Sequence, residues 1–332
     1  MDLITQVVQI LESAPAWIIF SHMKLDGDAV GAAAALFETG ILLDKQVRWF
    51  GPDPLPPSFA FLPHTDEYVA QKEYRFDGEE GIYIFLDSSN EDRGVLGLRE
   101  RLSGAVTLNI DHHEDNTRFG TLNCVDPEMS SAAELLWHIM TFAGWPITGK
   151  VAECLYTGII TDTGGFMFNN TTARTHHVAA DLLTRGVVPP RIDALINQTR
   201  SIEGMHLWGV ALGRVTCWGS EAQFAMTWLS HEDFKLTRAI VADTDSLVNQ
   251  LLLLRGVRFA VLIVEEEGKE ETKASFRSKE GMLTAASVAR SLGGGGHPRA
   301  SGATIAMPLE KAILLIRETV ENAYGRWTSA DR

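Results

Sequence analysis

Histidine and aspartate side chains recur in four short segments of the first half of the chain. The first segment is His22-Met23-Lys24-Leu25-Asp26-Gly27-Asp28, and the others centre on Asp87, on Asp111-His112-His113 and on Asp162. Imidazole nitrogens and carboxylate oxygens together suit divalent ions, Mn²⁺ above all, with Mg²⁺ or Co²⁺ as alternatives. The segments hold enough donors for two ions that share one bridging carboxylate.

Each segment taken alone also has an ordinary structural explanation. Asp28 can cap a helix, Asp87 can open a turn after an apolar strand, and the histidine pair can belong to a polar loop. Asp162 ends an apolar helical stretch, where the helix dipole does not favour a carboxylate. A bound cation would offset the unfavourable interaction of the Asp162 carboxylate with the helix dipole. Because four such segments occur at successive elements, a metal site is favoured over four separate structural explanations.

The elements that must position these segments alternate between strand and helix patterns. Apolar and β-branched runs predict strands at 17–20, 47–50, 82–86 and 106–110, and helical patterns lie at 29–43, 132–143 and 172–183. Ser131 and Glu134 are expected to form a capping box at the second of these helices. The alternation predicts an α/β domain with a parallel sheet and helices on both faces. Ligands collect at the carboxyl ends of such strands, so we expect the four segments to meet there.

The second half of the chain has a different pattern. Val188-Pro189-Pro190 predicts a boundary between a catalytic domain at 1–188 and a helical linker at 189–204. Residues 205–332 are expected to form a smaller mixed α+β domain. Its predicted elements are a hairpin of 215–219 and 223–229, a helix at 246–254, strands at 259–264, 273–277 and 302–306, and a helix after Pro308.

The four segments, in their order, resemble the four motifs of the DHH phosphoesterase superfamily. The resemblance implies that His22, Asp26 and Asp87 hold one divalent ion. It implies that a second ion is held by Asp87 as the bridge together with Asp28, His112 and Asp162. His113 would then face the scissile phosphate, and Asp111 would orient its neighbours from outside the ligand set.

The second half is similar to the substrate-binding domain associated with this superfamily. The similarity rests on Arg277-Ser278-Lys279, on the run Gly293-Gly294-Gly295-Gly296-His297, and on Ala300-Ser301-Gly302-Ala303. It implies that the substrate is bound by Arg277, Ser278, Gly294, Gly295, Gly296, His297 and Arg299. The glycine run is expected to expose consecutive backbone N–H groups to a phosphate. Gly165 departs from the pattern, because relatives commonly carry a larger polar or basic residue there.

Size, domain order and both motif sets look closest to the nanoRNase and pAp phosphatase branch of the superfamily. The implied activity is hydrolysis of short oligoribonucleotides and of 3'-phosphoadenosine 5'-phosphate (pAp) to mononucleotides. The formal net charge of -14 disfavours long duplex nucleic acid, which binds mainly through Lys and Arg. The alternatives are a linear dinucleotide phosphodiesterase, a RecJ-type single-strand exonuclease, a family II inorganic pyrophosphatase and a non-catalytic nucleotide sensor.

The remaining composition indicates a cytoplasmic protein. The three cysteines, Cys124, Cys154 and Cys217, are too sparse for a disulfide framework or a zinc cage. The first thirteen residues carry acidic but no basic side chains, unlike a signal peptide. The most apolar stretch, 247–264, is interrupted by polar and charged residues, so we expect no membrane partner. A homodimer formed through an edge strand or the linker helix is compatible with the sequence.

Overall fold

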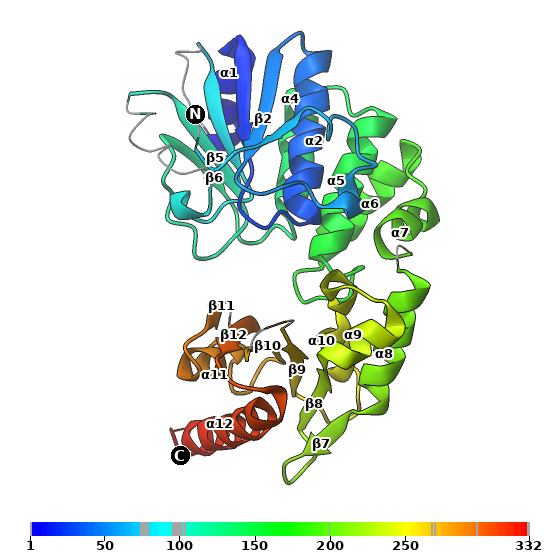
Figure 1. The fold of residues 1–332 in the computed structure, drawn as a ribbon. Coiled ribbons are helices and arrows are strands. Elements are labelled where there is room, and N and C mark those ends of the chain that lie inside the picture. Colours follow the sequence, from blue (N-terminus) through cyan, green and yellow to red (C-terminus); the bar gives the residue numbers. More distant parts are fainter. Residues whose placement is uncertain are drawn as a thin grey trace. The chain divides into compact units, whose positions relative to one another are not determined.

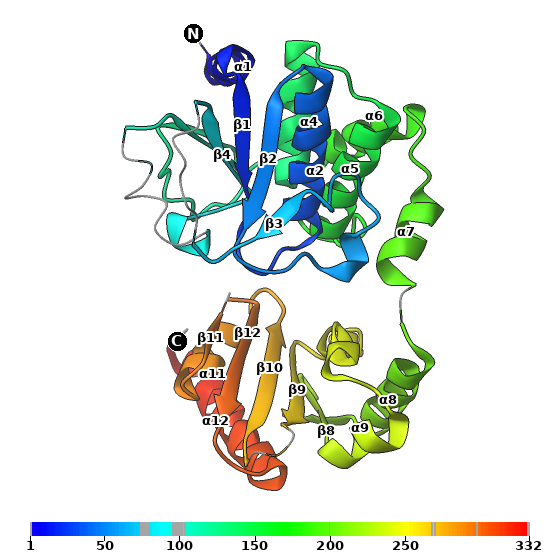
Figure 2. The same cartoon turned by 45° about the horizontal axis from the view of Figure 1, so that its top comes forward.

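The structure is a computed structural model that describes residues 2–73, 80–94, 102, 104–198, 200–266, 268, 270–296 and 298–330. The chain divides into two compact units, Met1–Thr199 and Arg200–Arg332. Figures 1 and 2 show the fold of each unit from two directions. The two units are considered separately.

The first unit contains a six-stranded sheet in the order β3-β2-β1-β4-β5-β6. Every neighbouring pair in this sheet is parallel, as the sequence predicts. Parallel pairing brings the carboxyl ends of all the strands to one edge. The strands are β1 (Ala16–Phe20), β2 (Gln46–Gly51), β3 (Tyr68–Ala70), β4 (Ile82–Leu86), β5 (Thr107–Asp111) and β6 (Leu122–Val125).

In the described part of the chain, helices cover one face of this sheet (Figure 1), whereas the sequence predicts helices on both faces. Alternate strand residues such as Trp17 and Ile84 join a core with apolar side chains of α1, α2, α4 and α5. The strand residues that point to the other face of the sheet, including Phe20 and Phe85, form a second apolar cluster with Leu102. The helices of the unit are α1 (Leu3–Ser13), α2 (Gly27–Leu42), α4 (Ala132–Ala143), α5 (Gly149–Asp162), α6 (Ala173–Thr184) and α7 (Pro189–Asn197), with short 3₁₀ turns η1 (Pro57–Phe59) and η2 (Glu91–Arg93).

The start of α4 differs in one respect from the capping box predicted there. Ser131 Oγ accepts a hydrogen bond from Glu134 N at 3.0 Å, as expected. The buried Glu134 carboxylate does not reach back to Ser131. It accepts hydrogen bonds from Ser130, Arg174 and Thr175 instead. The second hydrogen bond of the predicted capping box, from the Ser131 backbone to the Glu134 side chain, is therefore wrong, because the Glu134 carboxylate is hydrogen bonded to Ser130, Arg174 and Thr175.

The second unit is a mixed sheet in the order β11-β12-β10-β9-β8-β7, in which only the β8–β9 pair is parallel. Its strands are β7 (Thr216–Trp218), β8 (Phe224–Leu229), β9 (Phe259–Glu265), β10 (Thr272–Ser278), β11 (Gly295–Gly296) and β12 (Ala300–Ile305). Its helices are α8 (Ile202–Gly213), α9 (His231–Thr237), α10 (Leu247–Leu251), α11 (Ala285–Ser291) and α12 (Leu309–Ala330), with the 3₁₀ turn η3 (Val241–Thr244). Separate apolar cores line its two faces, which confirms the predicted mixed α+β domain.

Two sequence expectations change in detail. The segment predicted as one helical linker is occupied by α7 and by the beginning of α8. The helix expected at 246–254 is shortened to α10, because the chain turns after Leu251. Across the described residues, the structure contains no helix that is both long and apolar enough to span a membrane.

The buried Asp233 carboxylate fixes the start of α9. It accepts hydrogen bonds from Arg214 Nη1 and Nη2 at 2.5 and 2.8 Å, and from the backbone N and Oγ of Ser230 at 2.7 and 2.8 Å. Burial alone would raise the pKa of Asp233, but these donors hold that pKa below its ordinary value. The carboxylate therefore stabilises the fold only while it is ionised.

We expect Asp233→Asn to lower the free energy of unfolding by about 1–3 kcal/mol at pH 7, because charge-assisted hydrogen bonds to Arg214 are lost. A depressed carboxyl pKa contributes stability above the unfolded value of about 4 and loses it as pH falls through the folded value. The difference between the two proteins should therefore shrink below about pH 4 in urea unfolding. The exposed Asp66→Asn serves as the control, and an equal difference at pH 7 and pH 3 would contradict the assignment.

Candidate metal centre

The four histidine and aspartate segments converge at the carboxyl edge of the first sheet. The donor atoms form three groups, and within each group they all lie within 4.8 Å of one another. The groups are His22, Asp26 and Asp87; Asp28, His112 and Asp162; and Asp87, Asp111, His112 and His113. The structure thus brings together every first-half residue that the sequence singled out. Their roles as ligands remain predictions.

Asp87 lies at the centre of the cluster, directly after β4. Its side chain is 3% exposed, and its backbone has a left-handed φ of 53°. Such a conformation in a residue with a Cβ is costly and is concentrated at functional sites. Oδ2 lies 3.2 Å from His22 Nε2. Oδ1 is buried without an aligned hydrogen-bond donor among the described residues, although His112 Nε2 is only 3.4 Å away.

The two imidazoles present their Nε2 atoms to the carboxylates. His22 Nδ1 lies 2.6 Å from the carbonyl oxygen of Met23 and donates its proton to that oxygen, so Nε2 is the atom that faces Asp87 Oδ2. His112 Nε2 lies 3.4 Å from Asp87 Oδ1, 3.6 Å from Asp162 Oδ2 and 3.9 Å from Asp28 Oδ2. Donors that share one ion at about 2.1 Å stand roughly 3 Å apart. The spacing and the orphaned Asp87 oxygen therefore fit divalent ions.

Asp28 is held by the first turn of α4. Its Oδ2 accepts a hydrogen bond from Ala132 N at 2.6 Å, and its Oδ1 accepts one from Ala133 N at 2.9 Å. These are two of the N–H groups that a helix start leaves without partners, and the dipole there favours an anion. Asp26, rather than Asp28, caps α2, because its Oδ1 accepts from Ala29 N at 3.0 Å.

Asp162 closes α5 at the site, as the sequence predicts. Burial, with the nearby Asp87 carboxylate, raises the pKa of Asp162 to about 6 although His112 opposes the shift. Asn170 Nδ2 donates to the Asp162 carbonyl oxygen at 3.1 Å and lies 3.4 Å from Oδ2. A cation beside Asp162 would remove the cost of a carboxylate at this helix end.

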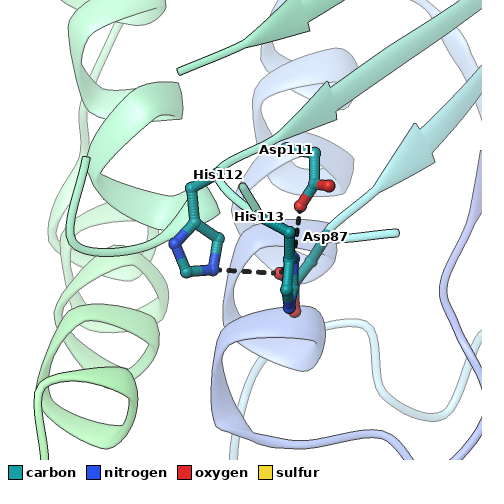
Figure 3. A group of neighbouring side chains, drawn as sticks. All are labelled: Asp87, Asp111, His112 and His113. Carbon is teal, nitrogen blue, oxygen red and sulfur yellow. Dashed lines mark hydrogen bonds and ion pairs between the residues drawn. The ribbon is translucent and has the colours of Figure 1, made fainter. Parts of the chain in front are cut away.

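His113 faces Asp111, as Figure 3 shows. His113 Nδ1 lies 2.7 Å from Asp111 Oδ1, and Asn116 Nδ2 donates to Asp111 Oδ2. Burial alone would lower the pKa of His113, but Asp111 and then Asp87 raise it. The fully buried Asp111 therefore fixes the ring of His113 and favours its protonated form, which leaves Nε2 as a donor.

The cluster holds more carboxylates than imidazoles, and the pKa values of its members are shifted accordingly. Burial alone would raise the pKa of Asp87, but His112 and His22 hold that pKa well below its ordinary value. Burial alone would lower the pKa of His112, but Asp87, Asp28 and Asp162 raise it to about 10. Burial and the carboxylates of Asp87 and Asp162 raise the pKa of Asp28 well above its usual range. His113 pairs with Asp111, so the imidazoles of His22 and His112 are left to face four carboxylates, those of Asp26, Asp28, Asp87 and Asp162. This excess of negative charge is the pattern of a cation site.

Glycines let the helices that carry Asp28 and Asp162 approach closely. A Cβ on Gly31 of α2 would stand 2.5 Å from the carbonyl oxygen of Cys154. A Cβ on Gly158 of α5 would stand 2.6 Å from Asp28 Oδ1 and 2.6 Å from Ala133 Cβ. The absence of a side chain at Gly158 therefore leaves room for the Asp28 carboxylate.

The predicted substrate-binding residues of the second unit lie around β10, α11 and β12. Arg277 Nε donates to Asn249 Oδ1 at 3.1 Å, Ser278 Oγ accepts from Ala285 N at 3.1 Å, and Arg299 Nη1 donates to Lys279 O at 2.7 Å. Gly295 and Gly296 form β11, which pairs with β12. His297 lies outside the described residues.

The sequence predicts that the backbone N–H groups of Gly293 to Gly296 are exposed to a phosphate, and this prediction is wrong for Gly293 and Gly294. Gly293 N donates to Arg290 O at 3.1 Å, and Gly294 N donates to Ala289 O at 2.8 Å. Both amides close the C-terminal end of α11, so they are not available to a phosphate. Glycine at 294 has a packing reason as well, because a Cβ there would stand 2.2 Å from Gly302 O.

Sequence reasoning missed three polar residues at the site. Asn116 links Asp111 to the Ser88 carbonyl, Asn170 supports Asp162, and Arg93 places Nη2 3.4 Å from His22 Nδ1. Asparagine and arginine are common in loops, so neither residue type gave a signal. Their partners lie between 5 and 71 residues away in the chain, and no motif links the two positions.

The fold and the site define a class of protein. Residues 16–159 match the family model of the DHH family N-terminal domain, and residues 236–324 match the family model of the DHHA1 domain. The chain belongs to the DHH family of phosphoesterases.

Two relatives extend the similarity along nearly the whole chain. The bifunctional oligoribonuclease and PAP phosphatase NrnA of Thermus thermophilus is 32% identical over 98% of this chain and 95% of its own. The protein of the same name from Bacillus subtilis is 30% identical over 91% of this chain and 93% of its own. The crystal structure of an exopolyphosphatase-related protein from Bacteroides fragilis matches 97% of this chain and 96% of that chain, with a TM-score of 0.88 and 26% identity.

We expect Gly158→Ala to weaken Mn²⁺ binding on the order of tenfold, because the added methyl displaces the Asp28 carboxylate. The same overpacking should lower the free energy of unfolding by about 1–3 kcal/mol. Gly209→Ala is the control, since Gly209 is helical with no heavy atom within 4 Å of its added Cβ. Titration calorimetry measures the affinity. A destabilised Gly158→Ala protein with wild-type Mn²⁺ affinity would show that Gly158 serves packing alone.

Proposed function

We propose that this protein hydrolyses short oligoribonucleotides and pAp to mononucleotides with two divalent ions, of which Mn²⁺ suits the donors best. The observation that carries the proposal is the buried cluster around Asp87, at the edge of the sheet where ligands of α/β folds bind. The relatives named for this pair of activities support the substrate class.

In this proposal His22, Asp26 and Asp87 hold one ion, and Asp28, Asp87, His112 and Asp162 hold the other. Bound divalent ions would supply a water of lowered pKa and stabilise charge on the phosphoryl oxygens. His113, oriented by Asp111 at 2.7 Å, donates from Nε2 to a phosphoryl oxygen and so stabilises the same charge.

The second unit contributes binding groups in this proposal. Arg277 and Arg299 supply cationic donors, and Ser278, His297 and the Gly295-Gly296 backbone complete the set. Arg277 Nε and Nη1 are hydrogen bonded to Asn249 Oδ1 and to Phe276 O, which orients the guanidinium. A planar guanidinium in a fixed orientation suits recognition of a phosphate. A homodimer also remains a prediction.

We expect the protein with Mn²⁺ to release mononucleotide from an RNA dinucleotide and phosphate from pAp. A 24-mer RNA should be cut poorly and pyrophosphate not at all. Asp87→Ala should abolish both activities, because the central carboxylate is lost. Rates on the four substrates are measured side by side by product release.

Each competing function gives a different result in that panel. Turnover of pyrophosphate alone would identify an inorganic pyrophosphatase. Processive loss of the 24-mer would indicate a RecJ-type exonuclease, and dinucleotide turnover without pAp turnover would indicate a linear dinucleotide phosphodiesterase. Tight nucleotide binding without turnover of any substrate would indicate a sensor.

We expect calorimetric titration of the metal-free protein with Mn²⁺ to give two ions per chain. Asp26→Ala should remove one of them, because Asp26 belongs to one ligand group only. Asp87→Ala should remove tight binding of both, and Asp111→Asn should keep the stoichiometry of two. Wild-type stoichiometry in Asp87→Ala would contradict the bridging role, and Asp66→Ala controls for loss of surface charge.

A further inference from the structure

The chain forms a closed loop beside the metal centre directly after Asp162. Residues 163–170, here called the 163–170 loop, begin next to Asp162 and return to it. Asn170 Nδ2 donates to the Asp162 carbonyl oxygen at 3.1 Å and to the Ser130 carbonyl oxygen at 2.9 Å. Both ends of the loop are therefore fixed to a residue of the donor cluster.

Internal hydrogen bonds hold the loop in one shape. The carbonyl oxygen of buried Thr163 accepts from Met167 N and Phe168 N, both at 2.9 Å. Gly164, Gly165 and Phe166 have positive φ values of 57°, 70° and 66°. The Phe166 ring packs against His176, with ring centroids 5.1 Å apart. The loop is thus a rigid turn with one aromatic ring packed inward.

Two apolar side chains leave this rigid turn toward solvent. Met167, at 78%, is the most exposed large apolar side chain among the residues that the structure describes, and Phe168 is 60% exposed. A Cβ on Gly164 would stand 2.5, 2.6 and 2.7 Å from Cζ, Cε1 and Cε2 of Phe168. Such nearly equal separations place Gly164 over the face of the ring and not at its edge. The exposed area of Phe168 therefore belongs to the opposite face and the edges.

The exposed ring lies within a nucleotide's reach of the donor cluster. Gly164 follows Asp162 by two residues, so their Cα atoms are at most about 8 Å apart. Asp162 Oδ2 is in turn 3.6 Å from His112 Nε2. A nucleoside whose phosphate is bound at the cluster can therefore extend its base over the 163–170 loop.

We propose that Phe168 is a stacking platform for a nucleobase of the substrate, with Met167 contacting the edge of the same base. This inference rests on the proposed function for the phosphate at the cluster. An open aromatic face stacks with any base, since every base has a π-face. The thioether of Met167 adapts its shape to bases of different size. The loop thereby selects nucleotides over phosphate esters without a base and leaves base identity unread.

The test compares the binding of AMP and of ribose 5-phosphate, which differ only in the base. Titration calorimetry with Mn²⁺ present measures both dissociation constants in the wild type and in Phe168→Ala, Phe168→Leu and Phe168→Trp. We expect the wild type to prefer AMP, and Phe168→Ala and Phe168→Leu to weaken AMP binding roughly 5- to 100-fold. Ribose 5-phosphate binding should not change, and Phe168→Trp should keep the preference.

Phe142→Ala is the matched control, because Phe142 on α4 is similarly exposed at 57%. Equal binding of the two ligands by the wild type, or equal weakening of both by Phe168→Ala, would overturn the inference. A wild type that binds neither ligand would overturn it too, as would a Phe168→Ala protein that changes only its oligomeric state. If AMP is preferred through Phe168 but pAp and dinucleotides are not hydrolysed, the proposed function fails and the stacking inference stands.

Discussion

The burial of several carboxylates around Asp87 is the constraint on which the rest of the structure depends. Asp28 and Asp87 are almost fully buried within reach of Asp162, and the imidazoles of His22, His112 and His113 lie close to this group of carboxylates. Carboxylates do not gather in this way without a compensating positive charge. Divalent ions satisfy the constraint, and they also supply the chemistry of phosphoester hydrolysis.

The fold meets this constraint by placing the candidate ligand residues within helices or within a few residues of a strand or helix end. The parallel sheet carries Asp87 and the histidine pair to one edge, because neighbouring strands end in register there. The first turn of α4 directs two N–H groups at Asp28. Gly31 and Gly158 then allow α2 and α5 to approach closely enough to bring Asp28 and Asp162 together. Catalytic geometry is held more accurately by such elements than by loops.

Polar residues on one side of the cluster orient His113, and the 163–170 loop lies on the other side. Asp111 and Asn116 fix the His113 ring on one side, and Asn170 ties the loop after α5 to the other. That loop leaves Met167 and Phe168 exposed, so an apolar surface adjoins a strongly polar one. A nucleotide has the same two parts, a charged phosphate and a flat base.

The sequence by itself determined the elements and the identity of the donors, and only the tertiary structure decided how they are used. Strand and helix patterns, and the places where β4, β5 and α5 end, depend on residues close together in the chain. The sequence pattern suggested Asp28 and not Asp26 as the cap of α2, and it paired Glu134 with Ser131. It also left the amides of Gly293 and Gly294 exposed, whereas the structure bonds them to α11. The Asn170 contact and the open face of Phe168 gave no sequence signal. Most of these depend on hydrogen bonds and packing between residues distant in sequence, and the rest depend on local geometry that several sequences share.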